Sequence, residues 1–199
     1  RHIGLSEAGA EQTERILAAW GTATWDMGRD FGTIGGRRGD VVAEVTTYRS
    51  DTYSEDSRKP EVAYGDTLDG DLSRRDFTVN AMAVRLPELT FVDPFGGLAD
   101  LAAKVLRTPV GPEQSFADDP LRMMRAARFA AQLGFEVEES TMAAMSAMAG
   151  RLAIVSAERV QAELVKLMLA ERPRAGLELM TWTGLAEVVL PEVPGLQLT

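Results

Sequence analysis

The chain has 199 residues, of which 45% are hydrophobic and 26% are charged, and its formal net charge is −9. This length suits one large domain or two small ones, and the composition is ordinary for a globular protein. The negative charge argues against indiscriminate nucleic-acid binding, because the long-range field repels phosphates, although it permits a local basic track.

Cysteine is absent, and no run of about 18 apolar residues occurs. Disulfides, thiolate metal sites and cysteine nucleophiles are therefore excluded, and no membrane span is expected. The N-terminus also lacks the pattern of a signal peptide. We expect a cytoplasmic protein that has no contact with a membrane. The sequence leaves the oligomeric state open.

The first part of the chain alternates between helix and strand patterns. Apolar residues at helical spacing predict a helix over residues 11–20. The glycine-rich residues 35–40 predict a turn, and residues 41–49 predict a strand because β-branched residues are frequent in them. Residues 50–72 are polar and are predicted to form a loop.

A short helix is then predicted to start near Asp76 and to end at Pro87. Residues 89–92 can form a strand, and residues 93–97 have the composition of a turn. Strands and helices that alternate with short connections predict a small α/β sheet domain, which we place at residues 1–110.

The second part, residues 111–199, has helical patterns only. Its helix boundaries are predicted at Asp119-Pro120 and Gly134, at Ser140 and Leu152, at Ser156, and at Pro173 and Gly184. The methionines between Ser140 and Leu152 are predicted to pack in the core. An α/β domain followed by an all-α domain is thus the predicted fold class.

Arg74, Arg75 and Asp76 are the first group of candidate functional residues. Near a helix start, arginines supply forked donors to phosphate, and a carboxylate accepts from sugar hydroxyls or holds an arginine in place. These residues can therefore clamp the phosphates and ribose of a nucleotide. The alternative is a capping aspartate beside solvated arginines, and the triplet by itself favours that alternative.

Asp119 and Arg122 form the second group, three residues apart at a predicted helix start. A carboxylate and a guanidinium held side by side can match the Watson–Crick edge of a base, because that edge is a pattern of donors and acceptors. The alternative is a capping aspartate with an i, i+3 salt bridge, which contributes only roughly a few tenths of a kcal/mol. The spacing alone favours this alternative.

Several segments in this order together resemble the class II CCA-adding tRNA nucleotidyltransferases and bacterial poly(A) polymerases. They are residues 45–49, 74–81, 93–101, 118–129 and 156–159. Trp25-Asp26 and residues 118–126 are most similar to actinobacterial members. The resemblance runs from about Glu11 to Pro191. It implies a polymerase-β-like nucleotidyltransferase head, partial here, at residues 1–110, followed by a helical neck at residues 111–199.

The resemblance assigns nucleotide binding to both groups of candidate residues. It implies that the head segment binds the incoming nucleotide and its sugar, and that Asp119 and Arg122 select CTP or ATP without a template. The implied nucleotide-binding set is Arg74, Arg75, Asp76, Asn80, Asp119, Arg122, Arg125 and Arg128. Members usually have Glu-Asp where this chain has Asp118-Asp119. Residues 93–97 correspond to a flexible element that reshapes the site between CTP and ATP; the alternative is a plain turn.

A two-metal site is also implied, and this sequence does not complete it. Members hold Mg²⁺ chiefly with an Asp-x-Asp pair on an early strand, and the aligned positions here are Arg1 and Ile3, which cannot bind magnesium. Glu44 can be the third carboxylate that some members use, or else a solvent-facing strand residue. We expect a chain that is incomplete at both ends, with an altered start or lost catalysis as alternatives. Catalytic residues therefore stay unassigned.

Basic residues of the neck are predicted to hold tRNA phosphates, namely Arg151, Arg159 and Lys166. The alternative is a set of solvated helix faces on which Glu158, Glu163, Glu171 and Glu178 balance the positive charges.

The resemblance implies an enzyme that adds CMP and AMP to tRNA 3′ ends without a template. Its implied partners are the tRNA 3′ end, CTP and ATP, and its cofactor is Mg²⁺. The chain as given is expected to bind nucleotide but to catalyse poorly. A poly(A) polymerase, or an enzyme that adds only CC or only A, is the alternative within the same class. A non-catalytic nucleotide- or RNA-binding module is the alternative outside it.

Overall fold

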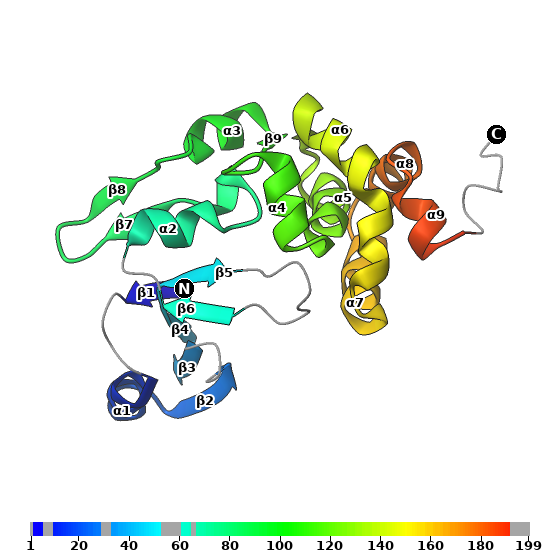
Figure 1. Ribbon diagram of the computed structural model, residues 1–199. Coiled ribbons are helices and arrows are strands. Elements are labelled where there is room, and N and C mark those ends of the chain that lie inside the picture. Colours follow the sequence, from blue (N-terminus) through cyan, green and yellow to red (C-terminus); the bar gives the residue numbers. More distant parts are fainter. Residues whose placement is uncertain (1, 6–9, 29–32, 53–60, 65–66, 192–199) are drawn as a thin grey trace. The chain divides into compact units, whose positions relative to one another are not determined.

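The computed structural model describes residues 2–5, 10–28, 33–52, 61–64 and 67–191. The chain divides into two compact units, residues 1–74 and residues 75–199, and Figure 1 labels their helices and strands. The boundary between the two compact units falls earlier than residue 110, where we predict that the nucleotidyltransferase head ends and the helical neck begins. That head–neck boundary stays a prediction. None of the described helices is long and apolar enough to cross a membrane.

The first unit is built on a sheet with the strand order β1-β4-β3-β2. Strand β1 pairs in parallel with β4, and the β2–β3 and β3–β4 pairs are antiparallel. Its elements are β1 (His2–Leu5), α1 (Ala10–Trp20), β2 (Ala23–Gly28), β3 (Thr33–Arg38), β4 (Val41–Thr47), the β5 (Arg49–Thr52) and β6 (Glu61–Tyr64) hairpin, and α2 (Leu68–Ser73).

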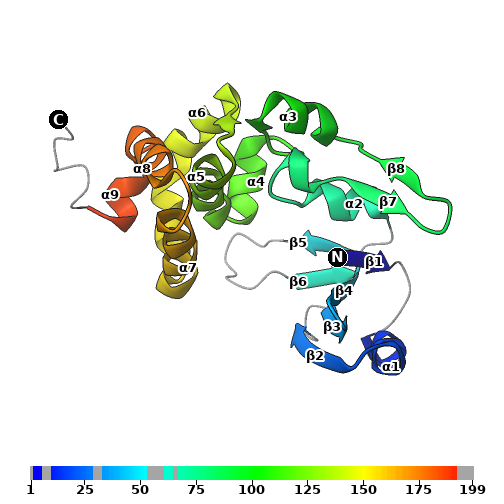
Figure 2. The same cartoon turned by 180° about the vertical axis from the view of Figure 1, so that it is seen from behind.

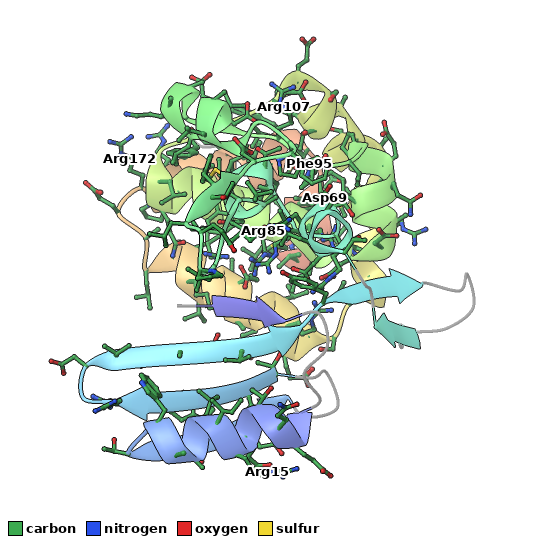
Figure 3. The ribbon with its side chains drawn as sticks, turned by 90° about the vertical axis from the view of Figure 1, so that its left-hand side faces the viewer. Arg15, Asp69, Arg85, Phe95, Arg107 and Arg172 are labelled. Atoms are coloured by element: carbon green, nitrogen blue, oxygen red, sulfur yellow. The ribbon has the colours of Figure 1, made fainter. Side chains whose placement is uncertain are left out.

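Helix α1 lies against this sheet through a small apolar core (Figure 3). Leu17 packs with Ile34 and Val45, and all three side chains are buried. The predicted helix over residues 11–20 and the predicted strand that begins at residue 41 are therefore confirmed.

Two predictions for the first unit are wrong in part. Gly35 and Gly36 belong to strand β3, and the turn consists of Gly39, with a positive φ of 59°, and Asp40. A side chain at Gly35 would meet the Trp25 indole at 2.1 Å, so the glycine allows close packing between strands. The predicted loop over residues 50–72 contains β5, β6 and α2, while residues 53–60 and 65–66 lie outside the described residues. Thr67 begins α2 by accepting from the Gly70 N–H.

The second unit is mostly helical and is arranged around α5 (Leu121–Leu133), as Figures 1 and 2 show. Its other elements are η2 (Thr78–Asn80), β7 (Ala83–Arg85), β8 (Thr90–Val92), α3 (Gly97–Ala103), β9 (Val105–Leu106), α4 (Pro112–Asp118), β10 (Glu136–Val137), α6 (Glu139–Met148), η3 (Ala149–Ile154), α7 (Ala157–Met168), α8 (Pro173–Trp182) and α9 (Leu185–Val189). A side chain at Gly176 would meet the Ala127 carbonyl oxygen at 2.7 Å, so glycine lets α8 approach α5 closely.

The predicted helix from Asp76 to Pro87 is wrong. The chain makes one turn of 3₁₀ helix, η2, and then the β7–β8 hairpin. The backbone of residues 83–85 pairs with that of residues 90–92 and not within a helix, and the start of the segment is held by tertiary contacts: the Thr78 N–H donates to the Arg107 carbonyl oxygen, and the Thr78 hydroxyl donates to Asp100.

The turn at residues 93–97 leads directly into α3. The Asp93 carboxylate accepts from the N–H groups of Gly97 and Leu98, at 2.7 and 3.0 Å, and so caps that helix. A side chain at Gly97 would lie 2.2 Å from the Thr78 carbonyl oxygen, so α3 can pack on η2 only because glycine stands there. The predicted mobility of this segment stays a prediction.

Most helix boundaries of the second unit follow the sequence. Gly134 ends α5 with a φ of 67°, Ser156 is the N-cap residue of α7, and Pro173 begins α8. The cap of α6 was assigned wrongly, because Glu138, and not Ser140, accepts from the Thr141 N–H at 2.9 Å. The Ser140 hydroxyl instead donates to the Glu138 carboxylate.

This cap makes a prediction about acid stability. The hydrogen bond from Ser140 is the main cause that lowers the pKa of Glu138 to about 2, although burial acts in the opposite direction. A lowered carboxyl pKa stabilises the fold above the ordinary value and loses that effect as the pH falls from about 4.5 towards 2. We expect Glu138→Gln to lower the free energy of unfolding by about 1 kcal/mol near neutral pH.

Chemical denaturation over a range of pH tests this, with Glu136→Gln as the control at an exposed position two residues away. The difference between Glu138→Gln and the unmodified chain should shrink as acid is added. A difference that is independent of pH would contradict the ionised cap.

Candidate functional site

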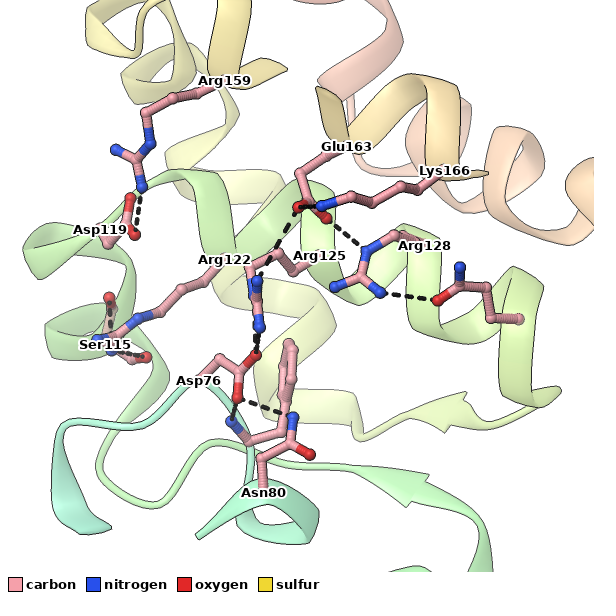
Figure 4. A network of polar contacts seen from close by, with 12 residues as sticks. Asp76, Asn80, Ser115, Asp119, Arg122, Arg125, Arg128, Arg159, Glu163 and Lys166 are labelled. Atoms are coloured by element: carbon pink, nitrogen blue, oxygen red, sulfur yellow. Dashed lines mark hydrogen bonds and ion pairs between the residues drawn. The ribbon is translucent and has the colours of Figure 1, made fainter. Parts of the chain in front are cut away.

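Asp76 connects the arginine-rich segment to helix α5. Its buried carboxylate receives two hydrogen bonds on Oδ2 from Arg125, through Nε at 2.8 Å and Nη2 at 2.5 Å. On Oδ1 it accepts from the Phe77 N–H at 2.8 Å and from the Asn80 side-chain amide at 3.0 Å (Figure 4). One carboxylate therefore fixes both the backbone before η2 and the guanidinium of α5.

An aromatic pair supports this junction. Phe77 is fully buried and meets Phe129 of α5 edge to face, with ring centroids 5.8 Å apart. The guanidinium carbons of Arg128 and Arg125 lie 4.0 and 5.5 Å from the Phe129 ring centroid. Cation–π attraction adds to the ion pairs and limits the freedom of both arginines.

Glu163 of α7 binds the same arginines from the other side. The residue is 4% exposed, and its carboxylate accepts from Arg128 Nε at 2.5 Å and from Lys166 Nζ at 3.2 Å. Arg125 Nη1 lies 3.9 Å from it. Burial opposes ionisation and would raise the pKa of Glu163, but the hydrogen bonds and the positive charges outweigh burial and hold that pKa below its ordinary value.

Sequence reasoning missed Glu163, which it placed among the solvated acidic residues. The signal that could have found it is its spacing: residue 163 lies three after Val160 and four before Leu167, on the inward face of α7. Figure 4 shows the resulting chain of contacts from Lys166 through Glu163 and Arg125 to Asp76.

Asp119 and Arg122 lie at the start of α5, with each side chain bound to a different neighbour. Asp119 accepts from the Leu121 N–H on Oδ1 at 3.2 Å and from Arg159 of α7 on Oδ2 at 3.0 Å. Arg122 is 7% exposed and donates from Nη1 to the Ser115 hydroxyl at 2.8 Å. In the described part of the chain, no ion pair joins the two side chains to each other, so of the alternative reading the i, i+3 salt bridge is not formed, while the contact of Asp119 with the Leu121 N–H is.

The remaining nucleotide-binding candidates have different surroundings. Arg74 belongs to the first unit, where it donates to Asp71 at 2.5 Å, and Arg75 begins the second unit. Arg128 is 8% exposed and also donates to Gln132 at 2.7 Å, so its contacts are those of a residue that holds α5 to α7. Its predicted contact with nucleotide is untested.

The described residues do not fit a divalent metal ion. Glu44 is exposed on β4, where its strand neighbours are His2 of β1 and Gly35 of β3. Ile3, at one position implied for the metal-binding pair, lies beside Val45, and Arg1 is outside the described residues. Among the described residues, no group of three or more His, Cys, Asp or Glu side chains could hold a metal.

The basic residues predicted for RNA binding each contact the protein. Arg151 donates to the Ala117 carbonyl oxygen at 3.3 Å, Arg159 binds Asp119, and Lys166 binds Glu163. The side chains of Arg159 and Lys166 are 54% and 55% exposed, so solvent still reaches them. Their role in RNA binding stays a prediction.

Comparison with known families gives two matches. Residues 5–107 match the family model described as "Poly A polymerase head domain". Residues 134–196 match the model described as "Probable RNA and SrmB- binding site of polymerase A". The predicted fold class, a nucleotidyltransferase head followed by helices, is confirmed.

Individual relatives agree with these matches. A CCA-adding enzyme of Levilactobacillus brevis is 42% identical over 163 residues, which cover 81% of this chain and 41% of that protein. The crystal structure of Bacillus stearothermophilus CCA-adding enzyme in complex with CTP is 35% identical with a TM-score of 0.81, over 92% of this chain and 43% of that one. A tRNA nucleotidyltransferase complexed with a primer tRNA and an incoming ATP analogue is 30% identical with a TM-score of 0.76, over 94% and 52%.

This chain therefore spans about two fifths of the length of the curated relative, 41%. The similarity includes both units, since the first structure covers 92% of the chain.

The contacts of Glu163 make a prediction about stability. Glu163→Gln removes the charge that compensates Arg128 and Arg125 in a buried setting, so we expect the free energy of unfolding near neutral pH to fall by about 3 kcal/mol. Because the pKa of Glu163 is lowered, its stabilisation is present above the ordinary carboxyl range and is lost as the pH falls below it.

Urea denaturation at several pH values measures this effect. Glu171→Gln makes the same change of charge at an exposed position and should leave stability within about 0.5 kcal/mol. Equal stabilities for the two variants near neutral pH would show that the buried cluster does not hold the helices together.

Proposed function

Because the chain belongs to the family defined by the poly(A) polymerase head domain, we propose that it selects CTP and ATP for template-independent addition to tRNA 3′ ends. The complete protein would add CMP twice and AMP once and release pyrophosphate at each step. The observation that carries this proposal is the placement of a carboxylate, Asp119, and a guanidinium, Arg122, at the start of the helix that also binds Asp76. Similarity to a CCA-adding enzyme bound to CTP supports it.

The chemistry of the base edges explains why such a pair would select two bases out of four. Cytosine and adenine carry an amino donor where uracil and guanine carry a carbonyl acceptor. An ionised carboxylate only accepts, and a guanidinium only donates. Asp119 would therefore accept from the amino group, and Arg122 would donate to the neighbouring ring nitrogen. Uracil and guanine would place an acceptor against the carboxylate and lose both hydrogen bonds.

Around this pair we propose further contacts to the rest of the nucleotide. Arg74 and Arg75 would bind phosphate oxygens with forked donors, and Asp76 and Asn80 would face the ribose hydroxyls. Arg125 would act indirectly, by fixing the orientation of the Asp76 carboxylate, to which it donates at 2.5 and 2.8 Å. A ribose contact at an oriented carboxylate loses less entropy than one at a mobile carboxylate.

Mg²⁺ is the cofactor that we propose for the complete protein, because a divalent ion neutralises triphosphate charge in phosphoryl transfer. The described residues do not fit it, and we assign no step to it here. The proposal for this chain is therefore nucleotide selection, with the tRNA 3′ end as the partner of the whole protein.

Equilibrium binding of the purified chain tests the proposed function. We expect CTP and ATP to displace a fluorescent nucleotide with similar affinities, and UTP and GTP to bind at least about tenfold more weakly, the loss expected when a site's buried polar groups are left unmatched. Preference for ATP alone would indicate a poly(A) polymerase. Equal affinities for all four nucleotides would reject base selection.

Incorporation of nucleotides completes this test. With tRNAs that lack CCA, CA or only A, we expect the 199-residue chain to add nucleotides at rates near background, because Ile3 cannot bind a metal ion. Strong magnesium-dependent addition of CMP would show that other residues of the chain supply the metal ligands.

The chemistry of Asp119 makes a sharper prediction. Asp119→Asn replaces an acceptor with an amide that can also donate, so the carbonyl groups of uracil and guanine become acceptable partners. We expect the preference for CTP over UTP, and for ATP over GTP, to fall about tenfold, while binding of inorganic triphosphate stays unchanged. Asp118→Asn, at the neighbouring residue that bonds to Gln114, is the matched control. An equal loss of affinity for all four nucleotides would contradict a base contact.

A further inference from the structure

Oppositely charged side chains three residues apart on a helix face are neighbours and ordinarily pair with each other. Asp119 and Arg122 have this spacing, but Asp119 lies in extended backbone just before α5, with φ −144° and ψ 98°, and the two side chains do not pair. The Asp119 carboxylate binds the Leu121 N–H and Arg159, while the Arg122 guanidinium binds the hydroxyl and carbonyl oxygens of Ser115 at 2.8 and 3.3 Å. Figure 4 shows the two side chains directed to different partners.

This separation matters for reading a base. If the two side chains bonded to each other, the carboxylate oxygens would face the guanidinium donors. The acceptor and the donor that a base edge needs would then satisfy each other, and a nucleotide would have to break an ion pair in order to bind. A pair whose members are held by other groups has its orientation fixed before the base arrives, so less binding free energy is lost to ordering.

We propose that Ser115 of α4 and Arg159 of α7 are positioning residues that keep the base-selecting carboxylate and guanidinium apart. This inference rests on the proposed function, in which Asp119 and Arg122 select the base. Neither Ser115 nor Arg159 needs to touch the nucleotide. Each acts through the side chain that it binds.

The two contacts differ in their surroundings. Ser115 is fully buried and Arg122 is 7% exposed, so their hydrogen bond lies in a setting of low dielectric where a lost acceptor is costly. Arg159 and Asp119 are 54% and 24% exposed, and solvent and salt weaken their ion pair. Ser115 should therefore have the larger effect, and the effect of Arg159 should decrease as the salt concentration rises.

The contacts also offer a second role for Arg159 beside the predicted one. Its predicted role was binding of tRNA phosphates, yet its Nη2 donates to Asp119 at 3.0 Å. A positioning role changes the choice between nucleotides and leaves RNA affinity as it was. An RNA-binding role does the opposite, so one set of variants separates the two.

The experiment measures the affinities of CTP, UTP, ATP and GTP by competition for the 199-residue chain and its variants. We expect Ser115→Ala to reduce the CTP-over-UTP and ATP-over-GTP preferences about tenfold and Arg159→Ala to reduce them less, about threefold, with unchanged affinity for inorganic triphosphate in both. Ser115→Thr, which keeps the hydroxyl, and Arg159→Lys, which keeps the charge, should retain part of the preference. Arg174→Ala is the control, since that exposed arginine of α8 pairs with Glu178.

A double substitution tests the route of the effect. In the Asp119→Asn background, Arg159→Ala should cause no further loss of selectivity, because its partner has already changed. Melting temperatures recorded in parallel identify a variant that fails to fold. If Ser115→Ala does not fold, the selectivity of Ser115→Thr tests the role of Ser115 in its place. Additive losses from the two substitutions would overturn the proposal for Arg159.

Other outcomes are equally decisive. Unchanged selectivity in Ser115→Ala and Arg159→Ala, with an unmodified chain that does prefer CTP and ATP, would reject the positioning role and leave the proposed function standing. No preference in the unmodified chain would reject the proposed function itself. Weaker binding of labelled tRNA by Arg159→Ala, with intact nucleotide selectivity, would assign Arg159 to RNA.

Discussion

The contact between Asp76 and Arg125 is the interaction on which the candidate site depends. It joins residues 49 positions apart in the sequence and connects the segment before η2 to the middle of α5. Because Asp76 is buried, its negative charge requires close donors, and the Arg125 guanidinium, the Phe77 backbone N–H and the Asn80 side-chain amide supply them. The position of the whole segment relative to α5 follows from this requirement.

The need to compensate buried charge also applies between α5 and α7. Arg125 and Arg128 place positive charge against a largely buried helix face, and Glu163 compensates it from the facing helix. Removing water makes each of these interactions stronger and each unpaired member more costly, so the cluster tolerates few arrangements. Phe129 contacts both guanidinium groups and Phe77, and so joins the charged cluster to the apolar core. The start of α5, with Asp119 and Arg122, is thereby held in place by contacts made further along the same helix.

The sequence predicted the helix boundaries where a single residue decides the backbone. Gly134 permits a positive φ, and Pro173 lacks the N–H that the interior of a helix would need, so both positions could be located without the fold. It failed where distant groups compete for the backbone. The helix expected from Asp76 is replaced by η2 and a hairpin, and the Thr78 N–H and hydroxyl in η2 bind Arg107 and Asp100. Propensity describes only the local preference, and these partners are 22 or more residues away.

By itself, the sequence identified candidate residues for the site and placed them in an α/β part followed by helices, because residue type, order and short-range spacing are all local properties. Only the tertiary structure decided which charges meet. Asp119 binds Arg159 of α7, Arg122 binds Ser115 of α4, and the acid that compensates the α5 arginines is Glu163. The physical reason is that an ion pair or a buried hydrogen bond depends on distance and on exclusion of water, and packing of separate helices sets both.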